Sequence, residues 1–388
     1  MKNRLLALIG VLTVPTAIVV GLQVGSVSVD GQTQNTTAWG HPNLEGIWLD
    51  VYATPLERDP ELGDREFATD EERAERDQAR MGSVGRDRRV TRGSQQDVAG
   101  AYNAVYTSVK PAGPRTSLVV DPADGRIPTL TEEAKRDDEI QREWRLMLLR
   151  NTETCQYDAP ACEGGTYGSP SPNRYDITPF YNTSRMNRHD GPEDQSTYDR
   201  CIAGSTPDFV GFRRIVQGED SIAFAYDTGQ GQGFQRVVYL GGNHPPIQIR
   251  LRHGDSRAHW EGETLVIETT NFSPKFTFRP GRPFSGAESG ANRVLTERYR
   301  RVDENTLNYE VTIADPTIWT APWTVRQELK RQNDQQNRIY YEPRCHEGNY
   351  GLPALLIGAR LEEQEFAEGR GPDPFSLDTA TDFGGGVQ

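Results

Sequence analysis

Strict alternation of apolar and polar residues in the second half of the chain constrains its fold more than any other feature. Every second residue is apolar in 306–313, and 323–330 largely repeats the pattern. Successive side chains of a β-strand point to opposite faces, so this period predicts strands with one buried face. Seven further short segments have strand composition between turn residues: 212–216, 221–226, 236–240, 247–251, 264–270, 294–302 and 338–342. This series of short strands without intervening helices predicts a mainly β fold, an antiparallel β-barrel or sandwich.

Helix signals flank the β region. Leu130 and Thr131 supply a hydrophobic staple and an N-cap before acidic residues, which predicts a helix of about five turns. The charged stretch 70–92 favours a solvated helix or a flexible excursion, and Pro353 opens a predicted C-terminal helix. The expected regions are a signal peptide and linker (1–34), a polar, partly helical region (35–150), an irregular cysteine-containing loop region (151–208), an antiparallel β domain (209–352) and a C-terminal helix with a disordered acidic tail (353–388).

The first residues have the pattern of an export leader. Lys2 and Arg4 precede an apolar run over 5–22, as in a signal peptide, although a run of this length also fits an uncleaved anchor. We therefore expect a periplasmic or extracellular protein, with no stable membrane span after leader cleavage. The net charge of −13 argues against a nucleic-acid partner, because phosphate neutralisation requires a positive field.

Export would place the four cysteines in an oxidising environment; they are Cys155, Cys162, Cys201 and Cys345. An oxidising compartment favours their pairing, and four cysteines allow three connectivities. A bridge between Cys155 and Cys162 would close easily within a short polar loop, and would leave Cys201 for Cys345. No C-x-x-C spacing occurs, so a zinc–thiolate site is disfavoured.

Four segments carry a resemblance to a known family: HWEGETLVIETTNF (259–272), TERYRRVD (296–303), DPTIWTAPWT (315–324) and CHEGNYGL (345–352). They resemble a widespread family of exported bacterial proteins of uncharacterised activity, and the resemblance extends over most of 120–360. The chain departs from that family at Arg293, where a histidine is expected, and at 241–244, which lacks an Asp-Gly-Arg segment. The resemblance implies an exported, β-rich protein with a Cys201–Cys345 disulfide, and it supplies no activity.

The densest group of chemically active residues follows Cys345. Histidine is the side chain most often used for proton transfer and a carboxylate can orient it, so His346 and Glu347 are a candidate pair for general acid–base catalysis. The alternative is a polar plug at the end of a barrel. Asp315 is the third catalytic candidate, although its position before Pro316 also suits a turn.

Two further groups are candidates for ligand binding. His253, Asp255, Arg257 and His259 share parity, so a strand would place them on one face as an anion or metal site, although Gly254 also suits a turn. Surface solvation is the simpler interpretation, and no metal is predicted. Aromatic residues in strands can line a cavity, but they also serve as plain core. The candidate substrate-binding residues are Trp319, Trp323, His259, Asn271 and Tyr350.

These observations support two functions of different classes. The first is an exported enzyme of the lyase, isomerase or cyclase type, which acts on a small organic substrate in a barrel cavity by His/Glu acid–base chemistry. No cofactor is expected: the sequence has no dinucleotide fingerprint, and the glycine-rich stretch 229–233 is predicted to be a flexible connection between strands. The alternative is a non-catalytic binding module for a hydrophobic or glycan ligand. Both imply a small-molecule partner, and the oligomeric state is left open.

Overall fold

The computed structural model describes part of the chain. The described residues are 36–81, 110–136, 139, 191–192, 199–202, 204, 206–209, 212–229, 232–273, 290–332 and 344–372. Residues 1–34, Cys155, Cys162, the segment 338–342, most of the helix predicted after Thr131 and the tail from 373 lie outside them. The signal-peptide and Cys155–Cys162 hypotheses therefore stay predictions.

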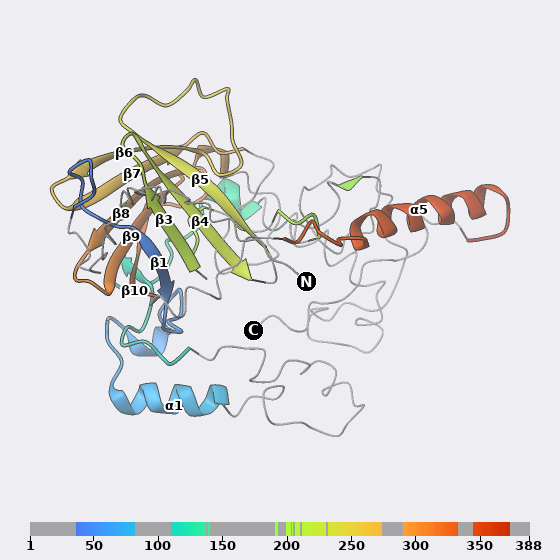
Figure 1. The fold of residues 1–388 in the computed structure, drawn as a ribbon. Helices are drawn as coiled ribbons and strands as arrows, with labels where there is room; N and C mark the ends of the chain where they lie inside the picture. Colours follow the sequence, from blue (N-terminus) through green and yellow to red (C-terminus); the bar gives the residue numbers. More distant parts are fainter. Residues whose placement is uncertain are drawn as a thin grey trace, which may run out of the picture. The chain divides into compact units, whose positions relative to one another are not determined.

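The described chain is mostly β-structure (Figure 1). Its strands are β1 (Gly46–Asp50), β2 (Val119–Asp121), β3 (Phe212–Gln217), β4 (Ser221–Gly229), β5 (Gln232–Leu240), β6 (Asp255–Glu261), β7 (Thr264–Thr270), β8 (Val294–Arg301), β9 (Thr306–Ala314) and β10 (Trp323–Arg331). The helices are α1 (Asp70–Met81), α5 (Gly351–Ala367) and a helical turn at residues 132–136, which begins after Thr131 as predicted; short 3-10 turns lie at Pro60–Leu62 and Gly290–Asn292. The prediction of a mainly β fold with a C-terminal helix is confirmed.

The strands close into a barrel and do not form a sandwich. The order β1-β3-β4-β5-β6-β7-β8-β9-β10 returns to its start because β1 also pairs with β10. The short strand β2 pairs with β10 at Thr324 and Val325, whereas β1 pairs with Leu329, Lys330 and Arg331. One edge of β10 is therefore shared by two short strands, and its pairing with β1 closes the ring of hydrogen-bonded neighbours.

One pairing departs from the predicted antiparallel pattern. Strands β5 and β6 run parallel, with Tyr239 opposite Arg257 and Leu240 opposite Ala258. A parallel pair needs a long crossover, and here residues 241–254 supply it. The sheet is consequently mixed. This crossover is also the longest connection between paired strands that the structure describes in full.

The structure also corrects individual elements. Residues 247–251, predicted as a strand, form a turn and an isolated bridge within this crossover. The apolar residues Ile247, Ile249 and Leu251 are half exposed there, so their alternation does not mark a buried strand face. Gly254, which also suited a turn, has a φ of +73° at the end of a turn, and the regular strand β6 begins directly after it. The described part of the stretch 229–233, predicted as a flexible connection, belongs to the ends of β4 and β5.

The core follows the predicted alternation. Leu307, Tyr309, Val311 and Ile313 on β9 are all fully buried. The corresponding residues of β10, Trp323, Val325 and Leu329, join the same cluster. Because interior-facing residues of every strand meet in one cluster, side chains fill the barrel as in other small barrels.

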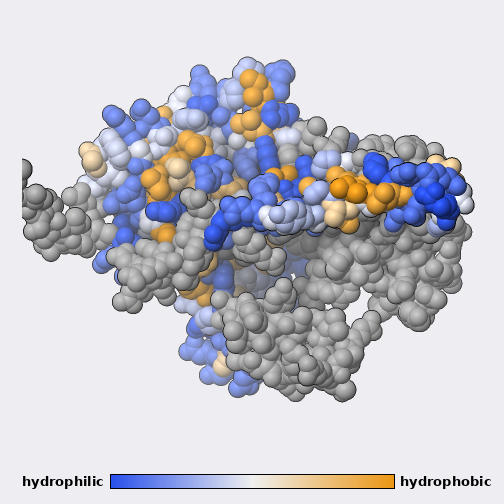
Figure 2. Space-filling view, turned by 45° about the vertical axis from the view of Figure 1, so that its right-hand side comes forward, coloured by the Kyte–Doolittle hydropathy of each residue, from blue (hydrophilic) through white to orange (hydrophobic). Residues whose placement is uncertain are grey.

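Helices α1 and α5 differ in character. Helix α1 begins with a capping box, in which the Thr69 hydroxyl accepts from the Glu72 N–H and the Glu72 carboxylate accepts from the Thr69 N–H. Helix α5 instead carries exposed apolar side chains, including Leu355, Ile357 and Leu361 (Figure 2). Within the described residues, no helix is long and apolar enough to cross a membrane.

Candidate functional site

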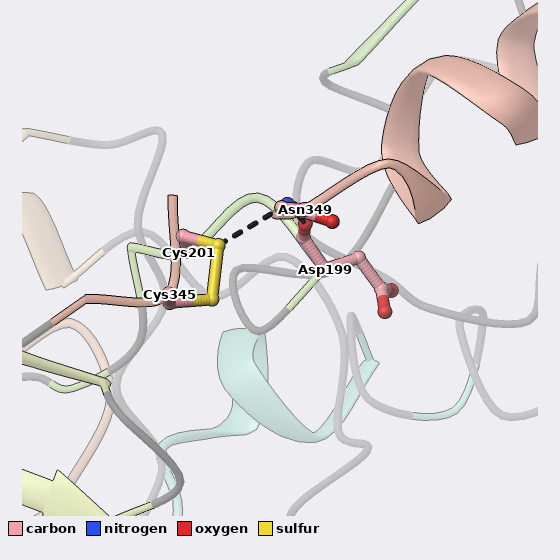
Figure 3. Close-up of a disulfide and its surroundings, with 4 residues drawn as sticks. All are labelled: Asp199, Cys201, Cys345 and Asn349. Carbon is pink, nitrogen blue, oxygen red and sulfur yellow. Dashed lines mark hydrogen bonds between the residues drawn. A yellow bond between two sulfur atoms is a disulfide. The ribbon is translucent and has the colours of Figure 1, made fainter. Parts of the chain in front are cut away.

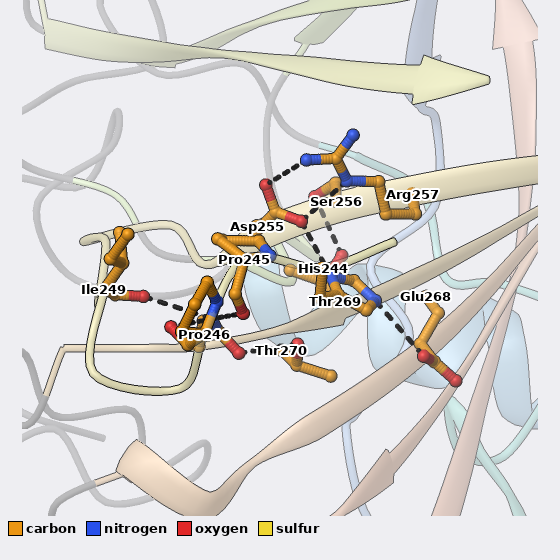
Figure 4. A network of polar contacts seen from close by, with 11 residues as sticks. His244, Pro245, Pro246, Ile249, Asp255, Ser256, Arg257, Glu268, Thr269 and Thr270 are labelled. Carbon is orange, nitrogen blue, oxygen red and sulfur yellow. Dashed lines mark hydrogen bonds and ion pairs between the residues drawn. The ribbon is translucent and has the colours of Figure 1, made fainter. Parts of the chain in front are cut away.

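A compact polar cluster lies on the outer face of the barrel where the crossover meets β6 and β7 (Figure 4). His244 belongs to the crossover, Asp255 and Arg257 to β6, and Glu268 to β7. The neighbouring β6 residue Ser256 points the other way, and its hydroxyl shares a hydrogen bond with that of Thr269 inside the barrel. Strand alternation therefore places Asp255 and Arg257 on the outer face together.

The imidazole of His244 lies between two carboxylates. Its Nδ1 is 2.7 Å from Oδ2 of Asp255, and its Nε2 is 3.2 Å from Oε1 of Glu268. The carboxylates differ in environment, because 9% of the Asp255 side chain is exposed against 58% for Glu268. The Asp255 contact is thus short and protected, whereas solvent or a ligand can reach the Glu268 contact.

Arg257 completes the cluster from the far side of Asp255. Its Nε donates to Oδ2 at 2.8 Å and its Nη2 to Oδ1 at 3.1 Å, a bidentate pair. Partial burial acts to raise the pKa of Asp255, but hydrogen bonds from Arg257 and His244 hold that pKa below its usual range. Asp255 is therefore ionised at neutral pH. The guanidinium of Arg257 also lies 5.1 Å from the ring centre of Tyr239 on β5.

Asn271 holds the crossover that carries His244. Its side-chain amide nitrogen lies within hydrogen-bond distance of the carbonyls of Pro245, Pro246 and Ile249, at 3.0, 3.3 and 3.1 Å. The residue is buried and has a φ of 59°, a conformation that asparagine tolerates better than most residues. The structure thus places this candidate substrate-binding residue beneath the cluster, where it positions the backbone.

Gly254 permits the crossover to enter β6 at this point. Its φ is +73°, and a Cβ atom there would lie 2.5 Å from the Thr270 carbonyl oxygen. Both the backbone conformation and the close approach require glycine. The turn at Gly254 is therefore the feature that brings Asp255 next to His244.

The residues predicted as one surface cluster separate in the structure. Asp255 and Arg257 pair, but His259 is 64% exposed and lies 3.3 Å from Glu261. His253 precedes β6 and stacks on Phe234 with ring centres 4.2 Å apart, while its Nδ1 is 3.3 Å from the Thr206 hydroxyl. Shared parity fails for His253 because the strand begins after it.

The C-terminal candidates lie in a different setting (Figure 3). The Cys201–Cys345 disulfide, implied by the family resemblance, is present and joins positions 144 residues apart. Asn349 donates to the Asp199 carbonyl at 2.8 Å and lies 3.1 Å from the Cys201 sulfur. The other candidates near this bridge, His346, Glu347 and Tyr350, are exposed, and the exposed fraction of Tyr350 is 80%.

The remaining candidates are buried. Asp315 accepts hydrogen bonds from the Thr317 N–H and hydroxyl at 3.1 and 2.6 Å, as in an Asx turn. Trp319 and Trp323 pack edge to face in the core with ring centres 5.5 Å apart. The structure thus gives these three residues turn and packing contacts, and none of the contacts involves His244.

His244 and Glu268 were missed by sequence reasoning. A signal for Glu268 exists in principle, because it stands opposite Arg257 on the neighbouring antiparallel strand. Nothing local marks His244, which approaches Asp255 through the parallel crossover. Among the described residues, no group of three His, Cys, Asp or Glu side chains has the arrangement of a metal site.

Comparison with known proteins adds no function. No protein-family model, no curated protein and no solved structure matches the chain.

Proposed function

We propose that the protein is an exported enzyme without a redox cofactor, of the lyase, isomerase or cyclase type, and that His244 transfers the proton. The observation that carries the proposal is the imidazole of His244 held at 2.7 Å from the shielded carboxylate of Asp255. A histidine oriented in this way by a carboxylate is suited to general acid–base catalysis near neutral pH.

The two ring nitrogens of His244 have different tasks in this proposal. Asp255 accepts the Nδ1–H and so fixes the orientation and tautomer of the ring, as an orienting carboxylate does in other catalytic sites. Nε2 then faces the exposed Glu268, at a longer distance of 3.2 Å. A substrate that displaces Glu268 takes over the contact with Nε2: the protonated nitrogen donates its proton as an acid, and once that proton has left, the same nitrogen accepts one as a base, with the imidazolium form stabilised by the ionised Asp255.

Arg257 supports both roles. It shares Asp255 with His244 and keeps that carboxylate ionised, which preserves the charge needed beside an imidazolium. Its guanidinium is partly exposed next to Tyr239, so a substrate with a carboxylate or a carbonyl would find a donor and an aromatic face together. This arrangement favours a small, oxygen-rich organic substrate.

Export is part of the proposal. The disulfide between Cys201 and Cys345 is typical of proteins from oxidising compartments. The basic residues and apolar run at the start of the chain agree with this localisation. A periplasmic or extracellular location is accordingly the expected setting of the reaction.

The competing location for the same chemistry is the C-terminal loop with His346 and Glu347.

The second candidate function, a non-catalytic binding module, is favoured by one observation, the 80% exposed ring of Tyr350 near the disulfide. An exposed aromatic ring can stack on a sugar or another ring. Trp319 and Trp323 do not offer such a surface because both are buried.

Deuterium exchange tests the proposed class across a panel of compounds. An enzyme of these classes that reversibly removes a carbon-bound proton and exchanges it with solvent labels its substrate in D₂O. We would incubate the protein with 2-oxo acids, β-hydroxy acids, uronic acids and cyclic ketones and follow deuterium incorporation by NMR. We expect wild-type protein to label at least one compound, and H244Q to lose about 10²-fold or more of that rate.

The matched control is H41Q, because His41 stacks on Trp260, which lies at the opposite end of β6 from Asp255. Equal rates in wild type and H244Q contradict the assignment of His244. A loss confined to H346A and E347A moves the centre to the C-terminal loop. Binding without exchange that Y350A abolishes favours the module, and no labelling or binding in the whole panel contradicts the enzyme proposal.

A further inference from the structure

A second polar cluster lies inside the barrel and is separate from His244. Arg236 of β5 forms two hydrogen bonds with Glu297 of β8, at 2.7 and 2.8 Å, and Tyr309 of β9 donates to the same carboxylate at 3.0 Å. Arg213 of β3 joins the cluster through Tyr299 of β8. All five side chains are buried. A buried network of this kind has to balance its charge or bind something that does.

The charges of the cluster do not balance by direct contact. Glu297 neutralises Arg236, but the hydrogen bonds of Arg213 go to neutral groups. Its Nη1 donates to the Tyr299 hydroxyl at 3.3 Å and its Nη2 to the main-chain carbonyl of Asp208 at 2.8 Å. The carboxylate of Asp208 attracts Arg213 electrostatically. Within the described residues, Nε of Arg213 is buried without a hydrogen-bond partner.

Aromatic rings flank the guanidinium of Arg213, and their faces stabilise its charge. The guanidinium lies 4.5 Å from the ring centre of Tyr309 and 5.7 Å from that of Tyr226. His253, whose Nδ1 lies 3.3 Å from the Thr206 hydroxyl, lies in the field of other arginines: burial, and then the charges of Arg252, Arg236 and Arg293, lower its pKa to about 3. A positive, low-dielectric environment favours an anion.

A short segment, residues 206–209, contacts Arg213, Gln327 and His253 at this end of the barrel, and we call it the roof. The Asp208 carbonyl accepts from Arg213, the Phe209 carbonyl accepts from Nε2 of Gln327 at 2.9 Å, and Thr206 contacts His253. The disulfide at Cys201 lies just before the roof in the chain. Main-chain carbonyls are weaker acceptors for a guanidinium than a carboxylate, so an anionic ligand can replace them.

We propose that Arg213 anchors a small organic carboxylate at this end of the barrel, beneath the roof. The carboxylate takes the place of the Asp208 carbonyl on Arg213 and supplies the acceptor that Nε lacks, while an apolar tail packs against the rings of Tyr226 and Phe234. Because the interior is filled, binding requires the roof to give up its hydrogen bonds. The site does not depend on the catalytic role proposed for His244.

Straight-chain carboxylates from butanoate to dodecanoate, with the matching alcohols, test the proposal on the full chain. Isothermal titration is expected to show binding of at least one carboxylate and a much weaker response to its alcohol. R213Q is expected to lower the affinity by about tenfold or more, because hydrogen bonds to a charged group are lost. The control R326Q removes an exposed arginine, paired with Glu310, and is expected to leave the affinity unchanged.

A wild-type measurement keeps the test valid if R213Q does not fold. With a ¹³C-labelled carboxylate, we expect nuclear Overhauser contacts from its tail to tyrosine ring protons, together with a shift of a slowly exchanging arginine Nε–H signal that is absent in R213K. Absence of carboxylate binding, equal affinity of R213Q and R326Q, or bound ligand without these contacts would overturn the proposal. The effect of H244Q on exchange activity does not bear on the carboxylate proposal, so the two proposals can fail separately.

Discussion

The chain contains two histidine–carboxylate neighbourhoods whose environments in the fold are opposite: one is exposed, and the other is held by hydrogen bonds. His346 and Glu347 are adjacent in the sequence, yet both are exposed beside the disulfide. His244 is 11 positions from Asp255 and 24 from Glu268, and it contacts both. Adjacency in a loop therefore does not build a site, whereas the parallel crossover and the β6–β7 hairpin bring distant residues to one spot.

The difference has a physical consequence. An exposed ion pair contributes little, because water screens the charges and both side chains lose rotamer freedom. Asp255 is instead shielded and held by Arg257, so its charge acts on His244 at close range. The two neighbourhoods should therefore respond very differently to the same kinds of change.

The largest effect is expected from removal of the disulfide, which ties only the C-terminal neighbourhood to the fold. The bridge spans 144 positions that include β3 to β10, and on the loop-entropy account a C201S/C345S variant loses about 4–5 kcal/mol of stability. Denaturant unfolding measures this loss. The hydrogen bonds of His244 should persist in the folded variant, because they go to Asp255 and Glu268 on the barrel wall. Loss of the His244–Asp255 contact, seen by imidazole NMR, would show that the neighbourhoods are coupled.

A matched pair of carboxylate substitutions comes next in size. D255N removes the acceptor of charged hydrogen bonds from Arg257 and is expected to cost about 1.5–3 kcal/mol at pH 7, whereas E347Q is expected to stay within about 0.5 kcal/mol of wild type. The lowered pKa of Asp255 fixes the sign of the pH dependence. The stabilisation due to ionised Asp255 is fully present above pH 3.8, the ordinary pKa of this carboxyl group. It is lost as the pH falls through the lowered pKa of the folded state.

Urea unfolding at pH 7 and pH 3 checks this pair. The difference between D255N and wild type should shrink at pH 3, where the unfolded wild-type chain takes up a proton on Asp255. A D255N penalty that is the same at both pH values would mean that shape, and not charge, sets the role of Asp255. A penalty in E347Q as large as that in D255N would remove the contrast between the two neighbourhoods.

Most of the barrel could be predicted from the sequence because its signal is local. Period-two alternation in 306–313 reports a strand with one buried face, and the structure gives β9 that face. Residues 247–251 show where this reasoning fails. Ile247, Ile249 and Leu251 alternate as in a strand, but the segment belongs to a crossover without a full set of pairing partners. Alternation records side-chain direction and not strand pairing.

The candidate site was harder to predict because it depends on register and topology. Asp255 and Arg257 were identified by parity, but Glu268 enters only through the pairing of β6 with β7. His244 requires in addition that β5 and β6 run parallel, which reverses the antiparallel expectation. Likewise, the buried pair of Arg236 and Glu297 is far apart in sequence and meets only when the barrel closes.

A third histidine extends the comparison and carries the smallest expected effect. His253 has no carboxylate among its contacts in the described chain; it stacks on Phe234 and touches Thr206. Burial, followed by the charges of nearby arginines, lowers its pKa from 6.5 to about 3. Between about pH 3 and pH 6.5, His253 therefore binds a proton in the unfolded chain but not in the folded chain. The stability due to neutral His253 is present above pH 6.5 and falls by up to about 1.4 kcal/mol per pH unit as the medium is acidified.

Urea unfolding of wild type, H253F and H259Q between neutral and mildly acidic pH tests this slope. Phenylalanine keeps a ring against Phe234 but cannot be protonated, so H253F should lose stability less steeply than wild type over this range. H259Q replaces an exposed histidine and should follow the wild-type slope. Equal slopes in wild type and H253F would mean that His253 is protonated in the folded chain. The positive field at this end of the barrel would then be weaker than its arginines suggest, and the case for an anion beneath residues 206–209 would weaken with it.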